Sequence, residues 1–236
     1  MKIDISKEIF EKFPGLNLGV VIAKNIQNSE GNSEIIELLR CAEEKVRDEF
    51  VPGELAQHPK LAPWRQAYSS FGAKPKKYKC SIEALIRRVL NDEALPDINN
   101  LVNLYNYLSL KHVLPMGGDD LDNVEGNIHL KIADGSETFI ALNSDEVKNP
   151  KQGEVVYADN NEILCRRWNW RECEKTKLTS ESKNIIIYAE GLPPVTQDEV
   201  ESAVKEIAED VKKFLGGENA KVKYYILNEG NSLIEF

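Results

Sequence analysis

Apolar residues recur at helical spacing in two long segments of the chain. In residues 34–50 they fall on one face of a helix whose other face is charged, and either Asn32 or Ser33 can cap its start. In residues 196–216 the apolar face is equally regular, and the first four residues carry the pattern of a capping box. Both segments are therefore predicted to be amphipathic surface helices.

Three shorter helices are predicted in the first half of the chain. One covers residues 61–71, and a second covers 82–90 with Ser81 as its N-cap. A third runs to about Lys111, with Asp97 as its N-cap because Asp97 follows a proline.

Strands are predicted at one early position and throughout the second half of the chain. The early one is residues 16–26, which are rich in β-branched residues and predict a buried strand. From Ile128 onward, short apolar segments alternate with turn signals, of which Asp134-Gly135 is the strongest hairpin signal and Asn160-Asn161 another. A buried strand starts near Asn184, and a last strand follows the C-terminal helix. Because helices cluster early and strands late, the sequence predicts an α+β fold rather than a doubly wound sheet.

Length and composition narrow the class of protein. The chain has 236 residues, 42% of them hydrophobic, and no internal repeat, which predicts one globular domain over residues 1–236. No apolar run approaches the ~18 residues of a membrane span, and charged residues interrupt the first 18 positions, so neither a membrane segment nor a signal peptide is expected. The four scattered cysteines favour a cytoplasmic protein with reduced thiols.

Charge is distributed unevenly along the chain. The whole chain has a net charge of −9, but residues 60–90 contain eight Lys or Arg and a single acid, Glu83. The acidic total argues against a protein that coats nucleic acid indiscriminately, whereas a local basic platform could still hold one RNA end. The loop from Lys74 to Lys79 is its densest part, and Tyr78 within it could stack on a base.

Three polar segments are candidate binding elements. The helix that contains Asn99 and Asn103 carries four asparagines in eight residues, which either cap the helix and fix loops or line a polar cleft. Next, two adjacent glycines precede three acids and allow close approach of a ligand, although a tight loop whose acids cap the next element explains them as well. In residues 165–171, tryptophans could stack on a nucleotide and arginines could neutralise its phosphate; in a strand, both tryptophans would share one face and could be core.

The candidate ligand-binding residues are Asn99, Asn100, Asn103, Asn106, Pro115, Gly117, Gly118, Asp120, Trp168 and Asn169. The candidate RNA-binding residues are Lys74, Lys76, Lys77, Lys79, Arg166, Arg167 and Arg171.

The remaining chemistry is sparse. His58, His112 and His129 show neither metal-ligand spacing nor a paired acid, and no nucleotide-binding or hydrolase motif occurs. We therefore expect no metal ion and no cofactor.

Several of these segments together resemble the B3/B4 tRNA-binding and editing domain of the phenylalanyl-tRNA synthetase β subunit. The match is strongest over residues 60–192, and the strings SIEALIRRVL and CRRWNWR are similar to those of stand-alone members of this family. The residues that carry the resemblance are Leu95–Tyr107, Pro115, Asp120–Asp122, Gly126, Gly153–Val156 and Thr179–Glu190.

The resemblance implies a three-layer α+β fold with mixed sheets and peripheral helices, and a cleft between the asparagine helix and the sheet. In the synthetase, the domain hydrolyses tyrosine wrongly attached to tRNA. The synthetase pattern has a histidine where this chain has Gly117, and a glycine-rich stretch followed by a tyrosine-reading glutamate near Trp168–Trp170. Glu172 and Glu174 lie near the position of that glutamate. The chain is too short to be a complete synthetase.

Three functions follow from these observations. The first is a hydrolase that acts in trans on mischarged aminoacyl-tRNA, with the acceptor end of tRNA as its partner. The second is a non-catalytic module that binds tRNA, a free amino acid or a related metabolite. The third is a scaffold in which the tryptophans are core and the asparagines only fix loops.

Overall fold

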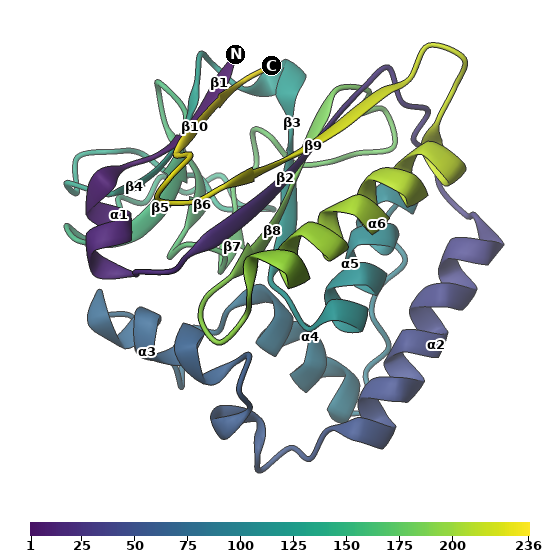
Figure 1. Ribbon diagram of the computed structural model, residues 1–236, viewed down its shortest axis with the longest axis horizontal. Helices are drawn as coiled ribbons and strands as arrows, with labels where there is room; N and C mark the ends of the chain where they lie inside the picture. The colour runs from purple at the N-terminus through teal and green to yellow at the C-terminus, as the bar shows by residue number, and fades with distance from the viewer.

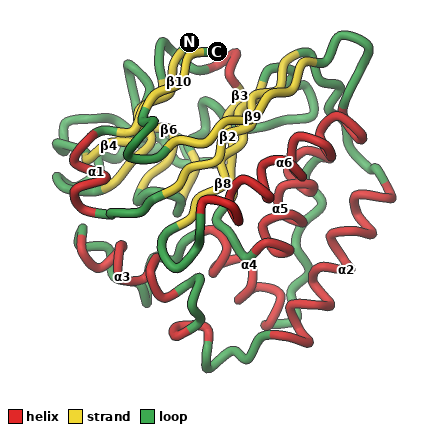
Figure 2. Tube along the Cα trace, viewed as in Figure 1, coloured by secondary structure: helices red, strands yellow, loops and turns green.

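The computed structural model describes residues 1–236 and has three layers (Figures 1 and 2). A six-stranded sheet faces a four-stranded sheet, and helices cover the other face of the four-stranded sheet. This architecture confirms the predicted α+β class and the mixed sheets. The two termini lie side by side at one end of the molecule (Figure 1).

The four-stranded sheet has the order β3-β8-β2-β9, and every neighbouring pair is antiparallel. At its centre, β2 and β8 are apolar on both faces because both faces are covered, as their β-branched residues predict. At the two edges lie β3 and β9, which have one neighbour each. The strands are β2 (Asn17–Lys24), β3 (Met116–Asp120), β8 (Ile185–Gly191) and β9 (Lys221–Leu227).

The six-stranded sheet has the order β10-β1-β4-β5-β6-β7, in which only β1 and β4 are parallel. The first strand was not predicted, because its four residues are too few to show a periodic pattern. The strands are β1 (Lys2–Ile5), β4 (Ile128–Ile132), β5 (Val155–Ala158), β6 (Ile163–Arg166), β7 (Arg171–Glu172) and β10 (Leu233–Glu235).

Helices α5 (Asn100–His112) and α6 (Gln197–Leu215) form the third layer, and α2 (Ser33–Glu49) packs on α5 (Figure 1). The predicted capping box of α6 is present, with both reciprocal hydrogen bonds between Thr196 and Glu199. The side chain of Asn32 caps α2. Apolar residues of α5 and α6 form a core cluster with the outer face of the four-stranded sheet.

The larger core cluster lies between the two sheets and extends beneath helices α1 (Lys7–Lys12), α3 (Ala62–Ser70) and α4 (Ser81–Leu90). Its centre contains aromatic pairs at right angles, such as Trp64 and Trp168 with ring centroids 5.0 Å apart. Two short 3₁₀ helices, η1 (Leu55–Gln57) and η2 (Leu121–Asn123), complete the fold. The two clusters meet at the four-stranded sheet, whose β2 and β8 contribute to both.

Three local predictions were wrong. Asn99, not Asp97, caps α5 by accepting a hydrogen bond from the Val102 amide, because the helix begins at Asn100 and Asp97 lies two residues before the cap position. The N-cap of α4 is Cys80, and Ser81 is already helical. Asp134-Gly135 makes no hairpin between consecutive strands: β4 pairs with β5, and residues 133–154 form a long excursion between them.

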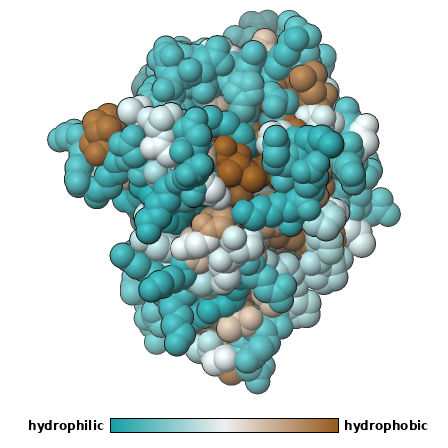
Figure 3. Space-filling model, turned by 90° about the vertical axis from the view of Figure 1, so that its left-hand side faces the viewer, coloured by the Kyte–Doolittle hydropathy of each residue, from teal (hydrophilic) through white to brown (hydrophobic).

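No helix of the structure is both long and apolar enough to cross a membrane. The face in Figure 3 is hydrophilic over most of its area, and hydrophobic residues on it form small separate patches. Such scattered exposure is normal for a protein surface.

Candidate acidic site between the two edge strands

The edge strands β3 and β7 of the two sheets approach one another at Gly117 and Glu172. A methyl group on Gly117 would lie 2.7 Å from Oε1 of Glu172, so only a glycine leaves room for this carboxyl group. Both residues are half-buried, and the solvent-accessible part of the site lies here. Burial and the nearby Asp119 raise the pKa of Glu172 well above its usual range.

Asp119 lies two residues along β3, deeper between the sheets. Its carboxylate accepts hydrogen bonds from the hydroxyls of Thr176 and Tyr188, the latter at 2.9 Å. Burial raises the pKa of Asp119 to about 6 even though both hydrogen bonds favour the charged form. The next strand, β8, supplies Tyr188 in register with Gly117.

Glu190 is the third buried acid, two residues beyond Tyr188 on the same face of β8. Its Oε1 accepts hydrogen bonds from the Tyr157 hydroxyl and the Trp168 indole, both at 2.6 Å, and its Oε2 accepts one from the Asn169 amide. Burial raises its pKa to about 7. The rings of Tyr157 and Tyr188 stack with centroids 4.7 Å apart and thus join the Glu190 group to the Asp119 group.

None of these three acids forms an ion pair with a lysine or arginine. Burial without a neighbouring cation raises the pKa of all three carboxyl groups above that of an ordinary carboxyl group. Such a group can accept or donate a proton in catalysis, and it can also bind the ammonium group of a guest.

Most predicted asparagines are engaged within the protein. Asn99 caps α5 and donates a hydrogen bond to the Leu178 carbonyl. Asn100 donates one to the Ser29 hydroxyl and accepts one from the Asn32 backbone amide. Asn103 accepts one from the Ile98 backbone amide and donates one to the Asp97 carboxylate. Asn106 is 8% exposed and makes no side-chain hydrogen bond. The first three amides thus tie loops to the helix, as one of the two interpretations predicted, and ligand binding by the asparagines stays a prediction.

The predicted turn residues also have structural partners. Pro115 accepts a hydrogen bond from the Glu190 amide, and Asp120 accepts one from the Ser182 hydroxyl at 2.6 Å. A methyl group on Gly118 would meet the Ile186 carbonyl oxygen at 2.4 Å, so this glycine permits close pairing of β3 with β8. Of this group, only Gly117 borders the acidic site.

The two tryptophans do not share a face, because the chain leaves β6 in a turn in which Arg167 and Trp168 have positive φ. Trp168 is fully buried and packs on Phe13 and Trp64. Trp170 is half-buried and packs edge-on against Tyr78 at 4.9 Å. The expectation of one continuous strand with both rings on one side was therefore wrong, although the prediction of a core role is correct for Trp168.

The predicted basic residues divide into two groups. Arg166 and Arg167 are 7% exposed and pair with Glu154, so internal carboxylate already neutralises them. Lys74, Lys76, Lys77 and Arg171 are exposed, and Lys79 is half-buried.

The basic loop is nevertheless adjacent to the acidic site. The Arg167 guanidinium stacks on Tyr78 at 3.9 Å and on Trp170 at 4.5 Å. Tyr78 belongs to the Lys74–Lys79 loop, and Trp170 lies two residues before Glu172. The stack therefore fixes the loop beside the strand that carries Glu172.

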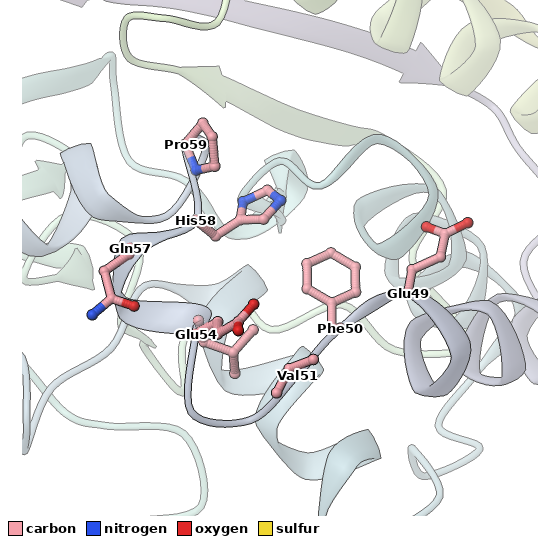
Figure 4. A pocket seen from close by; sticks show the side chains of 8 residues that line it. Glu49, Phe50, Val51, Glu54, Gln57, His58 and Pro59 are labelled. Atoms are coloured by element: carbon pink, nitrogen blue, oxygen red, sulfur yellow. The ribbon is translucent and has the colours of Figure 1, made fainter.

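Two histidines have acid partners that the sequence did not reveal. His112 Nε2 lies 2.7 Å from Glu206, and His129 Nδ1 lies 2.6 Å from Asp4. The partners are far away in the sequence, and no group of three potential metal ligands forms anywhere in the structure. His58 instead lines a surface hollow of about 360 Å³ with Phe50, in the loop after α2 (Figure 4). This hollow is formed by a different segment from the acidic site.

Asp119, Tyr157, Tyr188 and Glu190 were not predicted as site residues. Asp119 lies between two residues that were predicted, Gly118 and Asp120. Glu190 lies at the end of an apolar strand, which is an uncommon place for an acid. Alternation along β8 could have placed Tyr188 and Glu190 on one face, but no local pattern shows that β3 pairs with β8 or that β5 and β7 of the other sheet meet that face.

Fold and site together define an α+β protein with two facing sheets and an acidic site where their edge strands meet. The B3/4 domain family profile matches residues 63–216, and the chain belongs to this family. This result confirms the resemblance stated from the sequence.

The chain is similar to β subunits of phenylalanine–tRNA ligase. The β subunit of Fusobacterium nucleatum subsp. nucleatum is 33% identical over 94 residues, which are 39% of this chain and 11% of the relative. An N-terminal fragment of the subunit from Pyrococcus horikoshii has a similar structure, with a TM-score of 0.47, 13% identity, and coverage of 93% of this chain and 49% of the fragment. The chain thus spans about a tenth of the curated relative and half of the solved fragment.

Proposed function

We propose that this protein binds the aminoacyl end of a tRNA at the acidic site and hydrolyses a wrongly attached amino acid in trans. The observation that carries the proposal is Glu172, a half-buried carboxyl group with a raised pKa beside Gly117 in a chain of the B3/4 family. The relatives are β subunits of a tRNA ligase, which supports an RNA substrate.

Glu172 would act as the general base. Its carboxylate would take a proton from a water molecule while the water oxygen attacks the ester carbonyl. The tetrahedral intermediate would then expel the ribose oxygen, which receives the proton back from Glu172. An aminoacyl ester is already activated, so a positioned water and one base of suitable pKa supply much of the required rate.

The neighbouring groups support this use of Glu172. Asp119 lies close enough to raise its pKa, and the two acids together can hold the α-ammonium group of the aminoacyl ester. The exposed lysines of the Lys74–Lys79 loop, fixed beside β7 by the Arg167 stack, would bind phosphates of the acceptor end.

The test is deacylation of tRNAs charged with each amino acid in turn. At least one charged tRNA should lose its amino acid faster than in buffer, and Glu172→Gln should abolish the gain while leaving tRNA binding intact. The matched control is Glu174→Gln, two residues away on the outside, which should keep wild-type rates. Decay of every ester at the buffer rate refutes hydrolysis, and an unchanged rate in Glu172→Gln refutes the assigned base.

A non-catalytic role is the second candidate, because an acidic group without a cation can hold an ammonium group whether or not an ester is present. Calorimetric titration with free amino acids distinguishes it. Saturable binding that Glu172→Gln weakens, with no deacylation of any charged tRNA, would support this second function.

A further inference from the structure

The strand β9 forms the edge of the four-stranded sheet opposite to β3, and three surface hollows follow it. They have volumes of about 880, 500 and 220 Å³. The first and third share Lys221, and the second and third share Lys223 and Tyr225, so the hollows adjoin one another at this edge of the sheet. The second lies on the α6 side of β9 and the third on its other side. We call the three adjoining hollows the β9 groove.

The β9 groove is cationic although the protein as a whole is acidic. Two acids, Glu209 and Glu218, line it. The lysines that line it are Lys24, Lys183, Lys205, Lys212, Lys221 and Lys223. Of these, only Lys205 forms an ion pair, with Glu201. Most of the positive charge is therefore uncompensated within the protein.

Aromatic rings lie beside these lysines on both sides of β9. Tyr224 is 38% exposed, and the ammonium of Lys205 lies 5.9 Å from the centre of its ring. Tyr225 and Phe236 line the neighbouring hollow, where the ammonium of Lys24 lies 5.7 Å from the Phe236 ring. A lysine-lined track with exposed rings is typical of surfaces that follow a nucleic-acid strand, where phosphates meet the ammonium groups and bases stack on the rings.

We infer that the β9 groove binds single-stranded RNA, as a second contact separate from the aminoacyl site. In Figure 1, β9 lies in the upper part of the molecule and the segment between α3 and α4 in the lower part, so the β9 groove and the Lys74–Lys79 loop are different surfaces. Lysines on an edge strand also prevent edge-to-edge pairing of sheets. That function explains Lys221 and Lys223 on β9, but neither Lys212 on α6 nor Lys183 before β8.

The probe is a fluorescent 20-nucleotide oligouridylate, which carries no amino acid, so its binding does not depend on the proposed hydrolysis. Fluorescence anisotropy at several salt concentrations gives both Kd and its salt dependence. The combined variant Lys212→Glu, Lys221→Glu and Lys223→Glu should raise Kd about tenfold or more at low salt, and it should lower the slope of log K against log salt by about 2, since each phosphate contact contributes about 0.7.

The matched control reverses three exposed lysines outside the groove that form no ion pair, Lys12, Lys45 and Lys151. It changes the net charge equally and should raise Kd far less. An equal effect of both variants, or no effect of the β9 variant, overturns the inference. Should the charge-reversed chain fail to fold, the same lysines changed to Gln remove the contacts without adding negative charge.

Two further measurements test the kind of partner. Tyr224→Ala should raise Kd about fivefold or more because a stacking ring is lost, whereas Tyr224→Phe should bind as wild type. Polyglutamate of the same length should bind more weakly than the oligouridylate. Tighter binding of polyglutamate would show that the groove recognises an acidic protein segment, and the inference would be wrong.

Discussion

The buried Glu190 should make the stability of this protein depend on pH in an unusual direction. Its pKa is about 7 in the folded protein, against 4.5 for an ordinary glutamate, because it lies between the sheets. Between these two values the folded state keeps a proton that the unfolded state has released. The contribution of Glu190 to the free energy of unfolding should therefore be largest below pH 4.5, fall as the pH rises, and level off above 7.

The magnitude follows from the shift. One pKa unit corresponds to about 1.4 kcal/mol, so the full effect is about 3 kcal/mol, of which about 2.5 kcal/mol falls between pH 5 and 8. The three hydrogen bonds that Glu190 accepts are already included in this pKa. These hydrogen bonds lower the free-energy cost of burying the ionised carboxylate but do not remove it.

The perturbation is Glu190→Gln, which removes the titration and keeps the size of the side chain. Glutamine offers one acceptor oxygen to three donors, so an unsatisfied donor should lower the free energy of unfolding of the variant by about 1–3 kcal/mol. At pH 8 the variant should regain a similar amount, because it buries no charge there. The variant should thus be nearly as stable as wild type at pH 8 and less stable at pH 5.

The assay is urea unfolding followed by circular dichroism at pH 5, 6, 7 and 8. The difference in unfolding free energy between wild type and Glu190→Gln isolates this residue, because the other titrating groups are present in both chains. The control is Glu229→Gln, an exposed residue without an ion pair, whose difference should stay constant. Parallel pH profiles of wild type and Glu190→Gln would refute the reasoning.

Three other perturbations test the packing of the fold by the same unfolding measurement. Gly19→Ala drives a methyl group to 2.4 Å from a valine of α6 and should cost about 1–3 kcal/mol, while Gly53→Ala, in open space, should not destabilise by steric contact. Thr196→Ala removes the cap of α6 and should cost about 1 kcal/mol, whereas Thr196→Ser should keep most of it; equal losses would exclude the cap as the cause. Arg65→Ala removes one of the two cations on the fully buried Glu83 and should cost about 3 kcal/mol, and a loss below 1 kcal/mol would show that the remaining arginine suffices.

The elements that sequence predicted well are those whose signals are local. Helix α6 has its cap, its apolar face and its end within one segment, and β2 is β-branched along its buried length. The predictions for the Asp134-Gly135 turn and the Asp97 cap were wrong because tertiary contacts decide between local options there. At Asp134-Gly135, pairing of β4 with β5 overrides the turn signal.

The candidate site shows the same limit. Sequence singled out Gly117 and placed Glu172 near a pocket residue, because both lie within strings that resemble a family. It could not find Glu190 or Tyr157, which reach the site only through the packing of one sheet on the other. For Asn103 the sequence allowed either a loop-fixing or a cleft-lining role, and its hydrogen bonds with Asp97 and the Ile98 amide are those of the loop-fixing role.

The absence of a side chain at Gly117 decides what any guest of this site would meet. The synthetase pattern has a histidine at this position, and here the Glu172 carboxyl group takes the space that the first carbon of such a side chain would need. The proton acceptor that we propose for this site, Glu172, therefore comes from β7 rather than from β3. An acid beside Asp119 favours an ammonium group over a neutral or anionic guest, because bringing a positive charge between two carboxyl groups relieves their repulsion. The α-amino group is common to every aminoacyl ester. A glycine at 117 with Glu172 beside it therefore predicts a site that selects the aminoacyl linkage more strongly than the amino-acid side chain.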